Sequence, residues 1–295
     1  MKRALIVATV FKFLNFEKSD IQILIEMGYE VHTATNMKGA DWLRDDGTFD
    51  GINIQRHQID FGRTPFSKDS LTAYKELKQL IEKYRFDVIH CHTPVAAAIT
   101  RIAARDAHKK GTYVIYTCHG FHFHQKSSKK DWLLYYPMER FLALFTDMII
   151  TINKEDNCVL KKFKVEKKHY IPGVGIDTVH IAGLNAERRE MLEPMGIPVG
   201  AFVILTIGEL SSRKNQQVML KALGRIHDKN IYYILCGTGE KLNEYCTLAK
   251  NLGIDNNVIF TGQREHDWVM KLSHVVDLGA IPSAIEGLGL AGIEI

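Results

Sequence analysis

Residues 85–120, RFDVIHCHTPVAAAITRIAARDAHKKGTYVIYTCHG, decide the fold class because they encode a strand, a helix and a second strand in succession. The flanking runs RFDVIHCH and TYVIYTC are rich in β-branched and aromatic residues, and the first of them leads into a turn marked by Pro94. The alanine-rich segment between them is amphipathic and is followed by Gly111, which predicts a helix with a glycine at its end. Strand, crossover helix and strand in this order indicate an α/β domain with a parallel sheet.

The same alternation extends on both sides of this stretch. The run at residues 4–10 is apolar without polar alternation, as expected for a strand that is buried on both faces of a parallel sheet. The patterns predict further strands at 29–35, within 50–59 and at 147–153, and helices at 19–27, 70–84 and 133–145. The first half of the chain is therefore predicted to be one doubly wound α/β domain.

The pattern loosens between residues 161 and 183 into a charged run, KKFKVEKKHY, and a Pro/Gly turn, IPGVGID, where we place a linker. It then restarts, with strands predicted at 202–210, 231–239, 257–262 and 275–283 and helices at 215–227, 240–252 and 265–273. We therefore predict two domains, residues 1–175 and 176–295, facing across a cleft. Ligands of such sheets bind beyond the carboxyl ends of the strands, so functional residues are expected there.

Bulk composition narrows the possible functions. The 295 residues are 46% hydrophobic, enough for two buried cores, and 38 basic against 34 acidic residues leave a net charge of only +4. Such a mild charge does not favour nucleic acid as a partner. The five cysteines contain no Cys-x-x-Cys pair and stand mostly in apolar runs, which is typical of buried thiols in a cytoplasmic protein. The apolar run near the amino terminus is too short to span a bilayer, so we interpret it as a first strand.

Histidines gather at predicted strand ends in the first half. His119 follows the strand TYVIYTC and is expected to face the cleft, although a histidine bonded within its own domain would have the same pattern. His90 and His92 share one face of a strand, and HGFHFH adds His122 and His124. Histidines so spaced can bind zinc or iron, so a metal hydrolase is a rival hypothesis. No carboxylate stands beside either pair at a ligand-like spacing, which argues against it.

In the second half, ILTIGELSSRKNQQ places Gly208, Arg213 and Lys214 between a strand and a helix. Backbone amides at a helix start and two cationic side chains suit a diphosphate. An Arg-Lys pair in a loop can equally be an ordinary solvated surface. Gly237 and Gly239 in LCGTGE also follow a strand, but this short pattern is weak and fits a tight turn as well.

The order and spacing of these motifs resemble those of a known enzyme family. GEL-SS-RKN, LCGTG, NVIFTGQ, IPS and the closing EGLGLAGIE resemble the nucleotide-sugar domain of the retaining glycosyltransferases of family four. DVIHCHTPVAA, HGFHF and IPGVGID resemble the acceptor domain and linker of its bacterial capsule and exopolysaccharide branch. The resemblance implies a GT-B-like fold of two Rossmann-like domains, with the acceptor side in residues 1–175, the nucleotide-sugar donor side in 176–295, and no required metal or other cofactor.

The resemblance also implies roles for individual residues. Glu286 would lie against the donor sugar, and Glu294 would accept hydrogen bonds from the ribose hydroxyls. The backbone of the stretch between them would approach sugar and phosphate closely at Gly287, Leu288 and Gly289, because glycine lets a ligand come near.

Further roles carried over concern the diphosphate and the sugar. Lys214 and Arg213, after Gly208, would neutralise the diphosphate as the sugar-phosphate bond breaks, and His119 would position the donor sugar rather than act as a base. Glu209 departs from the pattern, because many relatives have arginine there, and a carboxylate cannot hold phosphate.

The implied reaction is transfer of a hexose or N-acetylhexosamine from a UDP-sugar to a lipid-linked saccharide, with retention of configuration, in surface polysaccharide synthesis. Lys126, Lys129 and Lys130 precede the aromatic residues Trp132, Tyr135 and Tyr136, a pattern that suits an anionic membrane surface and equally an ordinary core helix with a solvated turn. We therefore expect a cytoplasmic enzyme that can associate peripherally with the inner face of the cell membrane.

The last residues, AIPSAIEGLGLAGIEI, raise an alternative. Members of the resembled family continue past the second glutamate, so the chain is expected to be truncated, with an incomplete second domain and a short helix around Glu294. Short helices are marginal unless they are packed. Such a chain would bind UDP-sugar weakly and turn it over little, which keeps open an inactive sugar-nucleotide-binding or assembly subunit.

Overall fold

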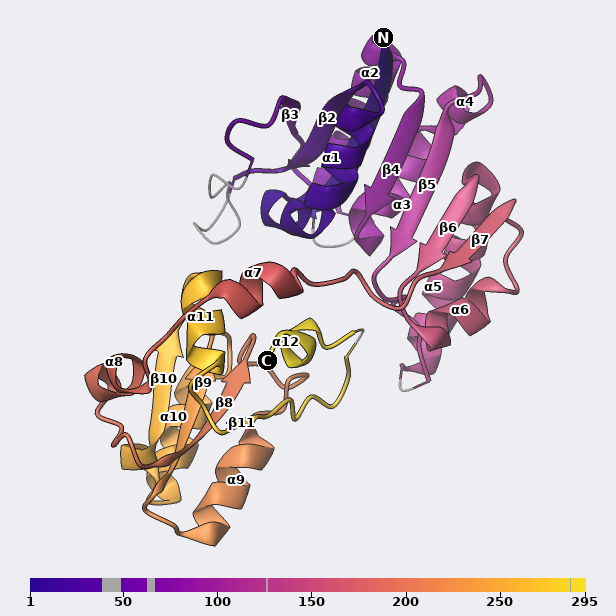
Figure 1. Cartoon of the computed structure of the whole chain (residues 1–295). Helices are drawn as coiled ribbons and strands as arrows, with labels where there is room; N and C mark the ends of the chain where they lie inside the picture. The colour runs from indigo at the N-terminus through magenta and orange to yellow at the C-terminus, as the bar shows by residue number, and fades with distance from the viewer. Residues whose placement is uncertain (39–48, 63–66, 126, 287) are drawn as a thin grey trace. The chain divides into compact units, whose positions relative to one another are not determined.

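Two successive parallel sheets organise the chain in a computed structural model that describes residues 1–38, 49–62, 67–125, 127–286 and 288–295 (Figure 1). Each sheet belongs to a separate compact unit, Met1–Val174 and Gly175–Ile295. The division falls next to the boundary predicted between residues 175 and 176. The α/β class predicted for both halves is confirmed by the elements below.

The first unit contains a seven-stranded sheet in which every pairing is parallel. The strands lie in the order β3-β2-β1-β4-β5-β6-β7, so that the order reverses between β1 and β4. A reversal of this kind is where ligands bind in open α/β sheets. The strands are β1 Lys2–Val10, β2 Tyr29–Asn36, β3 Ile54–Gln58, β4 Val88–His92, β5 Tyr113–Cys118, β6 Met148–Thr151 and β7 Lys167–Tyr170.

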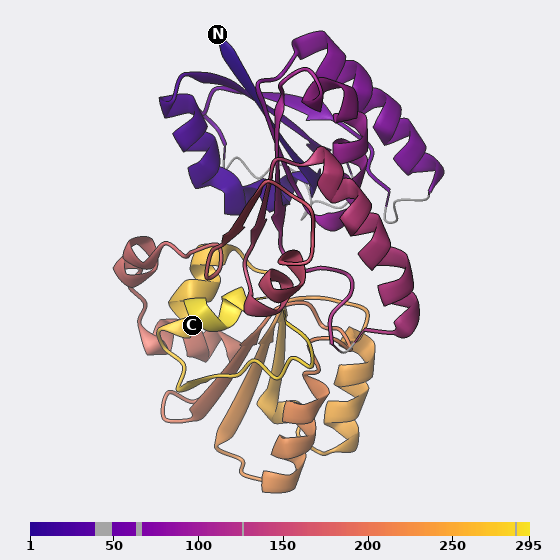
Figure 2. The ribbon, with the colours of Figure 1, turned by 90° about the vertical axis from the view of Figure 1, so that its right-hand side faces the viewer.

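Helices cover both faces of this sheet (Figure 2). Ser128 begins the helix after β5 with a capping box, in which its hydroxyl accepts from the amide of Asp131 and the Asp131 carboxylate accepts from the amide of Ser128. The helices are η1 Phe11–Glu17, α1 Lys18–Glu26, α2 Lys68–Tyr84, α3 Pro94–Ala103, α4 Arg105–His108, α5 Lys129–Leu142, η3 Ala143–Phe145 and α6 Lys154–Leu160.

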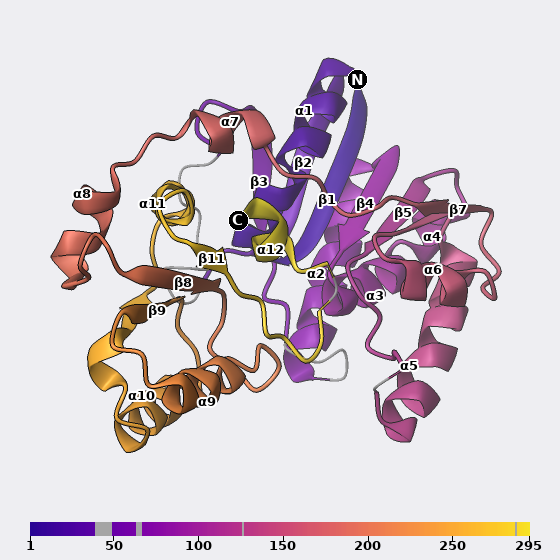
Figure 3. The same cartoon turned by 60° about the horizontal axis from the view of Figure 1, so that its bottom comes forward.

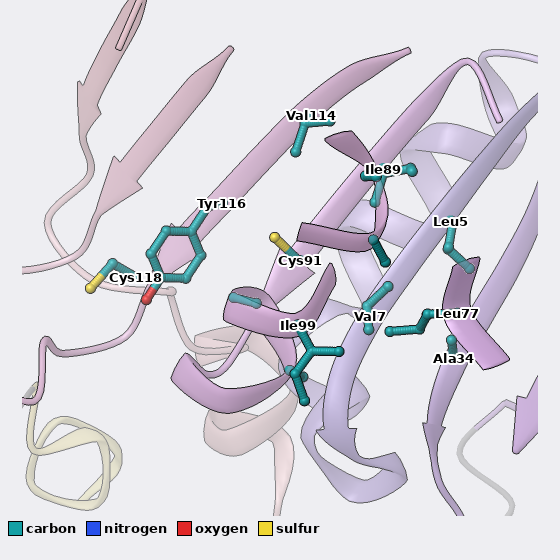
Figure 4. Close-up of a cluster of buried hydrophobic side chains, with 14 of the residues drawn as sticks. Leu5, Val7, Ala34, Leu77, Ile89, Cys91, Ile99, Val114, Tyr116 and Cys118 are labelled. Atoms are coloured by element: carbon teal, nitrogen blue, oxygen red, sulfur yellow. The ribbon is translucent and has the colours of Figure 1, made fainter. Parts of the chain in front are cut away.

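Alternation along the central strands divides the core into two layers. Leu5 and Val7 of β1 point to the layer shared with α2 and α3, whereas Ile6 of the same strand points to the layer shared with η1 and α1. Figure 4 shows the first layer, in which Ile89 and Cys91 of β4 lie beside Tyr116 of β5. Burying each large apolar side chain stabilises the fold by about 1.5–3 kcal/mol. His90 and His92 alternate with Ile89 and Cys91 along β4, so their side chains face the opposite layer.

Three local predictions for the first unit require correction. The segment predicted to be a linker contains an edge strand, β7, whose four residues are all exposed. Because two of them are lysines, as is common on edge strands, the segment lacks the apolar alternation by which a strand is recognised in the sequence. The single helix predicted after Pro94 is divided at Ala104 into α3 and α4. Finally, Cys158 is exposed, whereas Cys91, Cys118 and Cys236 are buried as expected.

The second unit contains a four-stranded parallel sheet in the order β10-β9-β8-β11, so that the order reverses between β8 and β11. Figure 3 shows α9 and α10 on one face of this sheet and α11 on the other. The strands are β8 Phe202–Ile207, β9 Ile231–Cys236, β10 Val258–Gly262 and β11 Leu278–Gly279. The helices are α7 Thr178–Gly183, α8 Arg188–Leu192, η4 Glu193–Met195, α9 Gln217–Ile226, α10 Leu242–Asn251, η5 Asp255–Asn257, α11 His266–Ser273 and α12 Leu290–Glu294.

The strand predicted over residues 275–283 is shorter than expected, because only Leu278 and Gly279 pair with β8. Before them, the Asp277 carboxylate accepts from the backbone amide of Val203 at 2.7 Å and from Arg188 at 2.8 Å. The Asp277 side chain thus fixes the start of β11, in place of further backbone hydrogen bonds between β11 and β8. After the strand, the chain leaves the sheet in the direction of Glu286.

Candidate functional site

The loop after β8 begins where two strand ends approach closely. Gly208 has φ +136°, and a Cβ placed there would lie 3.3 Å from Cε of Lys214. A Cβ on Gly237, at the end of β9, would lie 2.1 Å from the carbonyl oxygen of Gly208. Only glycine fits such a contact. Gly237 therefore serves the packing of two strand ends, and Gly208 leaves room for Lys214 to lie over the end of β8.

Lys214, Arg213 and Glu286 converge at the reversal of strand order between β8 and β11. Nζ of Lys214 donates to Oε1 of Glu286, and Nη1 of Arg213 lies 3.5 Å from Oε2 of the same carboxylate. Ser283 adds a 2.7 Å hydrogen bond to Oε1. The side chains of Lys214 and Glu286 are 15% and 23% exposed, so the pair is partly desolvated but reachable from solvent.

The surroundings keep Glu286 charged. Burial alone would raise the pKa of its carboxyl, but the hydrogen bonds from Lys214 and Ser283, together with the nearby charges of Lys214 and Arg213, lower the pKa below its ordinary value. The two loops are held against each other by the side-chain amide of Asn215, which donates to the carbonyl of Pro282 at 3.2 Å. A fixed array of two cations and one carboxylate is thus built at the strand ends before any ligand arrives.

Glu209, the departure from the family pattern, points toward the same cluster. Its carboxylate lies 3.8 Å from Nη2 of Arg213 and is mostly exposed. The backbone carbonyl of Glu209 accepts from the buried amide of Gln216 at 2.8 Å, which fixes the loop between them. Glu209 therefore offsets part of the charge of Arg213, while Lys214 has no contact with it among those resolved in the described residues.

The second glutamate of the closing motif lies on α12, a helix of five residues, as predicted. Oε1 of Glu294 is 3.0 Å from Nε2 of His266, the first residue of α11. This contact raises the pKa of His266, against the opposing effect of burial, and Asp267 adds to the rise. Gly289 precedes α12 with φ +70°, and Leu288 comes just before it. Gly287, predicted to contact the donor, lies outside the described residues.

Both glutamates predicted to bind the donor are thus engaged by cationic or titratable groups of the same unit. Glu286 is held by Lys214 and Arg213, and Glu294 by His266. A diphosphate approaching Lys214 would replace a carboxylate partner with a more highly charged one, since fixed cations bind phosphate strongly. A diphosphate would therefore compete with the Glu286 carboxylate for the same cations.

The first unit has its own cluster, at the reversal between β1 and β4. Nδ1 of His92, at the end of β4, lies 3.3 Å from Nε2 of His119, which follows β5. Oε1 of Glu17, the last residue of η1, lies 3.2 Å from Nδ1 of His92 and 3.6 Å from Nε2 of His119. His92 and Glu17 are buried, and the His119 side chain is 16% exposed. His119 is therefore the member of the cluster that is open to solvent.

Burial sets the protonation of this cluster. It lowers the pKa of His119 to about 4 and that of His92 well below its usual value, because a charged ring is costly to desolvate. Burial, reinforced by the charge of Asp20, raises the pKa of Glu17 to about 8. At neutral pH both rings are uncharged and Glu17 is mostly protonated. A neutral His119 suits hydrogen bonding to a hydroxyl group more than binding to a phosphate.

Backbone strain marks the same point of the sheet. Thr93, directly after His92, has φ +58°, which is rare for a β-branched residue. Its hydroxyl accepts from the amide of Thr9 at 3.0 Å and lies 2.7 Å from the Thr9 hydroxyl, which ties the ends of β4 and β1 together. Strain of this kind persists where the surroundings impose it and often occurs at functional sites.

The carboxylate expected to be missing from the histidine pairs is present in the fold. Glu17 is 75 positions before His92 in the sequence, so the absence of a carboxylate at a local spacing, which holds in the sequence, did not reveal the one that is near in space. The second pair is separate: the His122 ring stacks on Tyr135 at 4.9 Å. His90 and His92 do share a face, as predicted, with ring centroids 4.1 Å apart.

Glu17, His266 and Ser283 are the site residues that the sequence did not single out. Glu17 and His266 contact predicted residues from distant elements and belong to no motif that marks them, whereas Ser283 stands in the IPS motif, three positions before its partner Glu286. The only sequence indication for Glu17 is its position shortly after the first strand, because loops after strands line the ligand-binding edge of an open sheet.

Comparison with known proteins assigns the family. Residues 21–180 match Glycosyltransferase Family 4, and residues 187–295 match Glycosyl transferases group 1. The putative glycosyltransferase EpsD of Bacillus subtilis is 33% identical over 99% of this chain and 76% of its own length. The UDP-Gal:alpha-D-GlcNAc-diphosphoundecaprenol alpha-1,3-galactosyltransferase of Escherichia coli is 27% identical over 76% of this chain and 60% of its own length.

Solved structures show the same fold. HepE of Anabaena, crystallised with UDP and glucose, aligns with a TM-score of 0.77 at 19% identity, covering 100% of this chain and 78% of its own. Sucrose-phosphate synthase from Thermosynechococcus elongatus aligns with a TM-score of 0.77 at 14% identity, with the same coverage. No helix among the described residues is long and apolar enough to cross a bilayer. The chain belongs to Glycosyltransferase Family 4 and is a glycosyltransferase with a GT-B-like fold.

Proposed function

We propose that this chain transfers a hexose or N-acetylhexosamine from a UDP-sugar to a hydroxyl of a lipid-linked saccharide, with retention of anomeric configuration, during surface polysaccharide synthesis in the cytoplasm. The observation that carries the proposal is the convergence of Lys214, Arg213 and Glu286 at the strand ends of the second unit. Two cations held beside a carboxylate form a site for a diphosphate next to a sugar.

In the proposed reaction the bond between the anomeric carbon and the diphosphate breaks, and negative charge grows on the leaving UDP. Lys214 and Arg213 stabilise that charge, since cations already in place need no reorganisation during the reaction. Once they face the diphosphate, the Glu286 carboxylate is free to accept hydrogen bonds from sugar hydroxyls. Glu294 accepts from the ribose hydroxyls in the same way, after parting from His266. Gly208, Gly287, Leu288 and Gly289 allow the backbone to approach the donor.

His119 positions the donor sugar in this proposal. Its ring is neutral at physiological pH and is fixed by His92 on one side and by Phe13 at 4.8 Å, edge to face, on the other. A neutral ring nitrogen can donate to or accept from a sugar hydroxyl without attracting a second phosphate. We assign it to orientation of the sugar.

Similarity to named proteins supports the choice of donor and acceptor. The E. coli relative is named for a UDP-galactose donor and a GlcNAc-diphosphoundecaprenol acceptor, and HepE was crystallised with UDP-glucose. A UDP-sugar donor and a polyprenyl-diphosphate-linked acceptor follow by analogy. We further propose that transfer needs no metal ion, because Lys214 and Arg213 supply the positive charge that a divalent cation otherwise provides.

A lipid-linked acceptor requires access to a membrane surface, and α5 of the first unit is suited to it. Leu133, Phe141 and, in η3, Leu144 are exposed and spaced so that they share one side of the helix. Exposed Lys129 and Lys130 stand at its start. Trp132, Tyr135 and Tyr136, which the sequence suggested for this surface, instead pack partly buried against the core. Lys126 lies outside the described residues.

The deciding experiment incubates the purified chain with UDP-glucose, UDP-galactose, UDP-GlcNAc or UDP-GalNAc and a polyprenyl-diphosphate-linked sugar, in the presence of EDTA. We expect UDP release with one of these donors, and a product whose anomeric configuration, read by nuclear magnetic resonance, matches that of the donor. GDP- and ADP-sugars serve as base controls.

Each other outcome is informative. Binding of a UDP-sugar without release of UDP would indicate a sugar-nucleotide-binding or assembly subunit instead of an enzyme. Transfer that stops in EDTA would contradict the proposed independence from metal. An inverted product would overturn retention and leave the donor class intact.

A further inference from the structure

The buried cluster of the first unit has the composition and dimensions of a metal site. We propose that Glu17, His92 and His119 together bind one divalent transition-metal ion of the Zn²⁺ type. Each residue offers one ligand atom, and the three atoms lie within 4.8 Å of one another. This binding site is additional to the transfer reaction proposed above.

The geometry matches a tetrahedral ion. The three ligand atoms, Oε1 of Glu17, Nδ1 of His92 and Nε2 of His119, are separated by 3.2, 3.3 and 3.6 Å. Zn²⁺ bonds to histidine nitrogen and carboxylate oxygen are about 2.0–2.2 Å long, so neighbouring ligands of a tetrahedral ion are about 3.3–3.5 Å apart. The distances among the three atoms therefore match one face of such a tetrahedron.

The carboxylate oxygen is also without another use in the described part of the chain. Oε1 of Glu17 is buried and has no partner with hydrogen-bond geometry there, although both imidazoles are nearby. Polar atoms buried in this way are uncommon and call for an explanation. A cation between Oε1 and the two ring nitrogens supplies one, because it displaces the Glu17 proton to solvent and contacts all three atoms at once.

Separate elements hold the three ligands. His92 ends β4 and is paired in register with Thr117 of β5, two residues before His119. Glu17 ends η1. His90 lies behind His92 with its Nε2 bonded to the Thr117 hydroxyl at 2.8 Å, which fixes the ring against which His92 packs. Ligands fixed by rigid elements and packing are what a metal site requires.

The ligand set favours zinc and leaves a place for a fourth ligand. Two histidines and one glutamate are the protein ligands of several catalytic zinc sites, in which water or substrate completes the coordination. His119 is the most exposed of the three, so the fourth position lies on its side of the cluster. Carboxylate with imidazole also accepts Co²⁺, which serves as a visible probe.

The test measures metal binding directly on the full chain, freed of affinity tags and stripped of metal. We expect competition titration with a chromogenic chelator to give one Zn²⁺ per chain, and Co²⁺ to give the visible bands of four-coordinate cobalt. Glu17→Gln, His92→Gln and His119→Gln should each weaken Zn²⁺ binding at least about a hundredfold, since removal of a ligand exceeds the 10–100-fold loss typical of outer-shell changes.

His180→Gln is the matched control, because His180 also pairs with a carboxylate, Asp267 at 2.9 Å, but in the second unit. It should bind Zn²⁺ as the parent does. Absence of binding by the parent overturns the proposal, and so does parental affinity in Glu17→Gln and His119→Gln. If His92→Gln fails to show a cooperative thermal transition, the test rests on Glu17→Gln and His119→Gln. Glu17→Gln is nearly isosteric and His119 is partly exposed, so both variants are expected to fold.

A consequence rests on the proposed function. If His119 orients the donor sugar, an ion bound to Nε2 of His119 prevents that nitrogen from contacting the sugar. Zn²⁺ should then inhibit transfer in proportion to the occupancy of the metal site. The remaining activity of Glu17→Gln should be much less sensitive to Zn²⁺. The binding titration needs no sugar nucleotide, so a failed transferase assay leaves the metal proposal standing, and the reverse also holds.

Discussion

The functional cluster of the first unit is buried among groups that carry no opposite charge and is uncharged, whereas that of the second unit is partly buried, contains paired opposite charges and stays charged. Both clusters lie at a reversal of strand order in a parallel sheet. In the first, Glu17 has a pKa raised to about 8 and His119 one lowered to about 4, both mainly through burial. In the second, Lys214 lowers the pKa of Glu286 despite burial of that carboxyl.

The difference shows that position in the fold does not determine the electrostatics of a site. An unpaired group buried in an apolar surrounding loses its charge, while a group with an opposite charge in contact retains it. The uncharged cluster is suited to sugar hydroxyls or to a metal ion, and the charged cluster to phosphates. Variants of both units can test this contrast.

The largest effect is expected from a buried ion pair of the first unit. Arg101 of α3 and Glu139 of α5 are joined by two hydrogen bonds of 2.9 and 3.1 Å, with both side chains almost fully buried. Arg101→Leu leaves the Glu139 charge buried and should lower the free energy of unfolding by about 3–5 kcal/mol. Urea denaturation followed by circular dichroism measures it.

The control in the second unit is Lys241→Ala, which breaks the half-exposed pair with Glu244. It should cost less than about 1 kcal/mol. The double variant Arg101→Leu, Glu139→Leu should recover part of the loss, since no charge remains buried. Equal losses of unfolding free energy in Arg101→Leu and Lys241→Ala would show that burial does not make the ion pair of the first unit costlier to break than the half-exposed pair of the second.

The second effect concerns the phosphate site. Lys214→Ala should weaken UDP binding by roughly 1.5–3 kcal/mol, the range for a hydrogen bond with a charged group. Isothermal titration calorimetry with UDP measures the change. Lys221→Ala is the control, because Lys221 lies on α9 and contacts only Gln217 among the interactions resolved in the described residues, at 3.4 Å. If Lys214→Ala binds UDP like the parent, the cluster is an internal ion pair only.

The third effect concerns the membrane surface of the first unit. Replacing Lys129 and Lys130 by glutamine should weaken binding to vesicles rich in phosphatidylserine by about 2 kcal/mol, at about 1 kcal/mol for each lysine near the surface. Replacing Lys229 and Lys250 of the second unit changes the net charge equally and should have little effect. Cosedimentation at low salt gives both values. A parent chain that ignores such vesicles would remove α5 from the proposal.

The fourth effect separates the sugar from the nucleotide. His119→Ala should lower kcat/KM for transfer about tenfold, the scale of one hydrogen bond between neutral groups, and leave affinity for UDP unchanged because UDP lacks the sugar. Steady-state kinetics and calorimetry give the two values. Equal loss of both would indicate instead that His119 has a structural role.

The smallest effect is a pH dependence in the second unit. The pKa of His266 is raised by Glu294, so their interaction contributes stability that is fully present below about pH 6.5 and is lost as pH rises through the higher folded-state value. His266 is half-exposed, so we expect less than about 1 kcal/mol.

When His266 loses its proton at higher pH, the Glu294 carboxylate should become free to accept hydrogen bonds from the ribose hydroxyls of UDP. UDP is therefore expected to bind more tightly at pH 8 than at pH 6, by less than tenfold, and His266→Gln should remove most of the difference. Calorimetry at the two pH values tests this. Tighter binding at pH 6 in the parent chain would contradict the assignment of Glu294 to the ribose.

Much of the secondary structure could be predicted because its cause is local. The apolar run of β1 and the amphipathic period of α2 are visible within one window of the sequence. Gly28 stands two residues after the end of α1 with φ +82°, a conformation that glycine adopts without strain. The prediction missed β7 and made β11 too long, because the pairing of both strands depends on a neighbouring strand more than on their own composition.

Local patterns in the sequence were enough to predict two α/β units, the family resemblance, and the motifs that contain Lys214, Glu286, Glu294 and His119. Which side chains meet depends on the packing of elements that are distant in the sequence. Glu17 reaches His92 across 75 positions, and Lys214 reaches Glu286 across 72, because strand order brings the carboxyl ends of separate strands together. The protonation of each group then follows from burial and partners, which no local pattern of residues encodes.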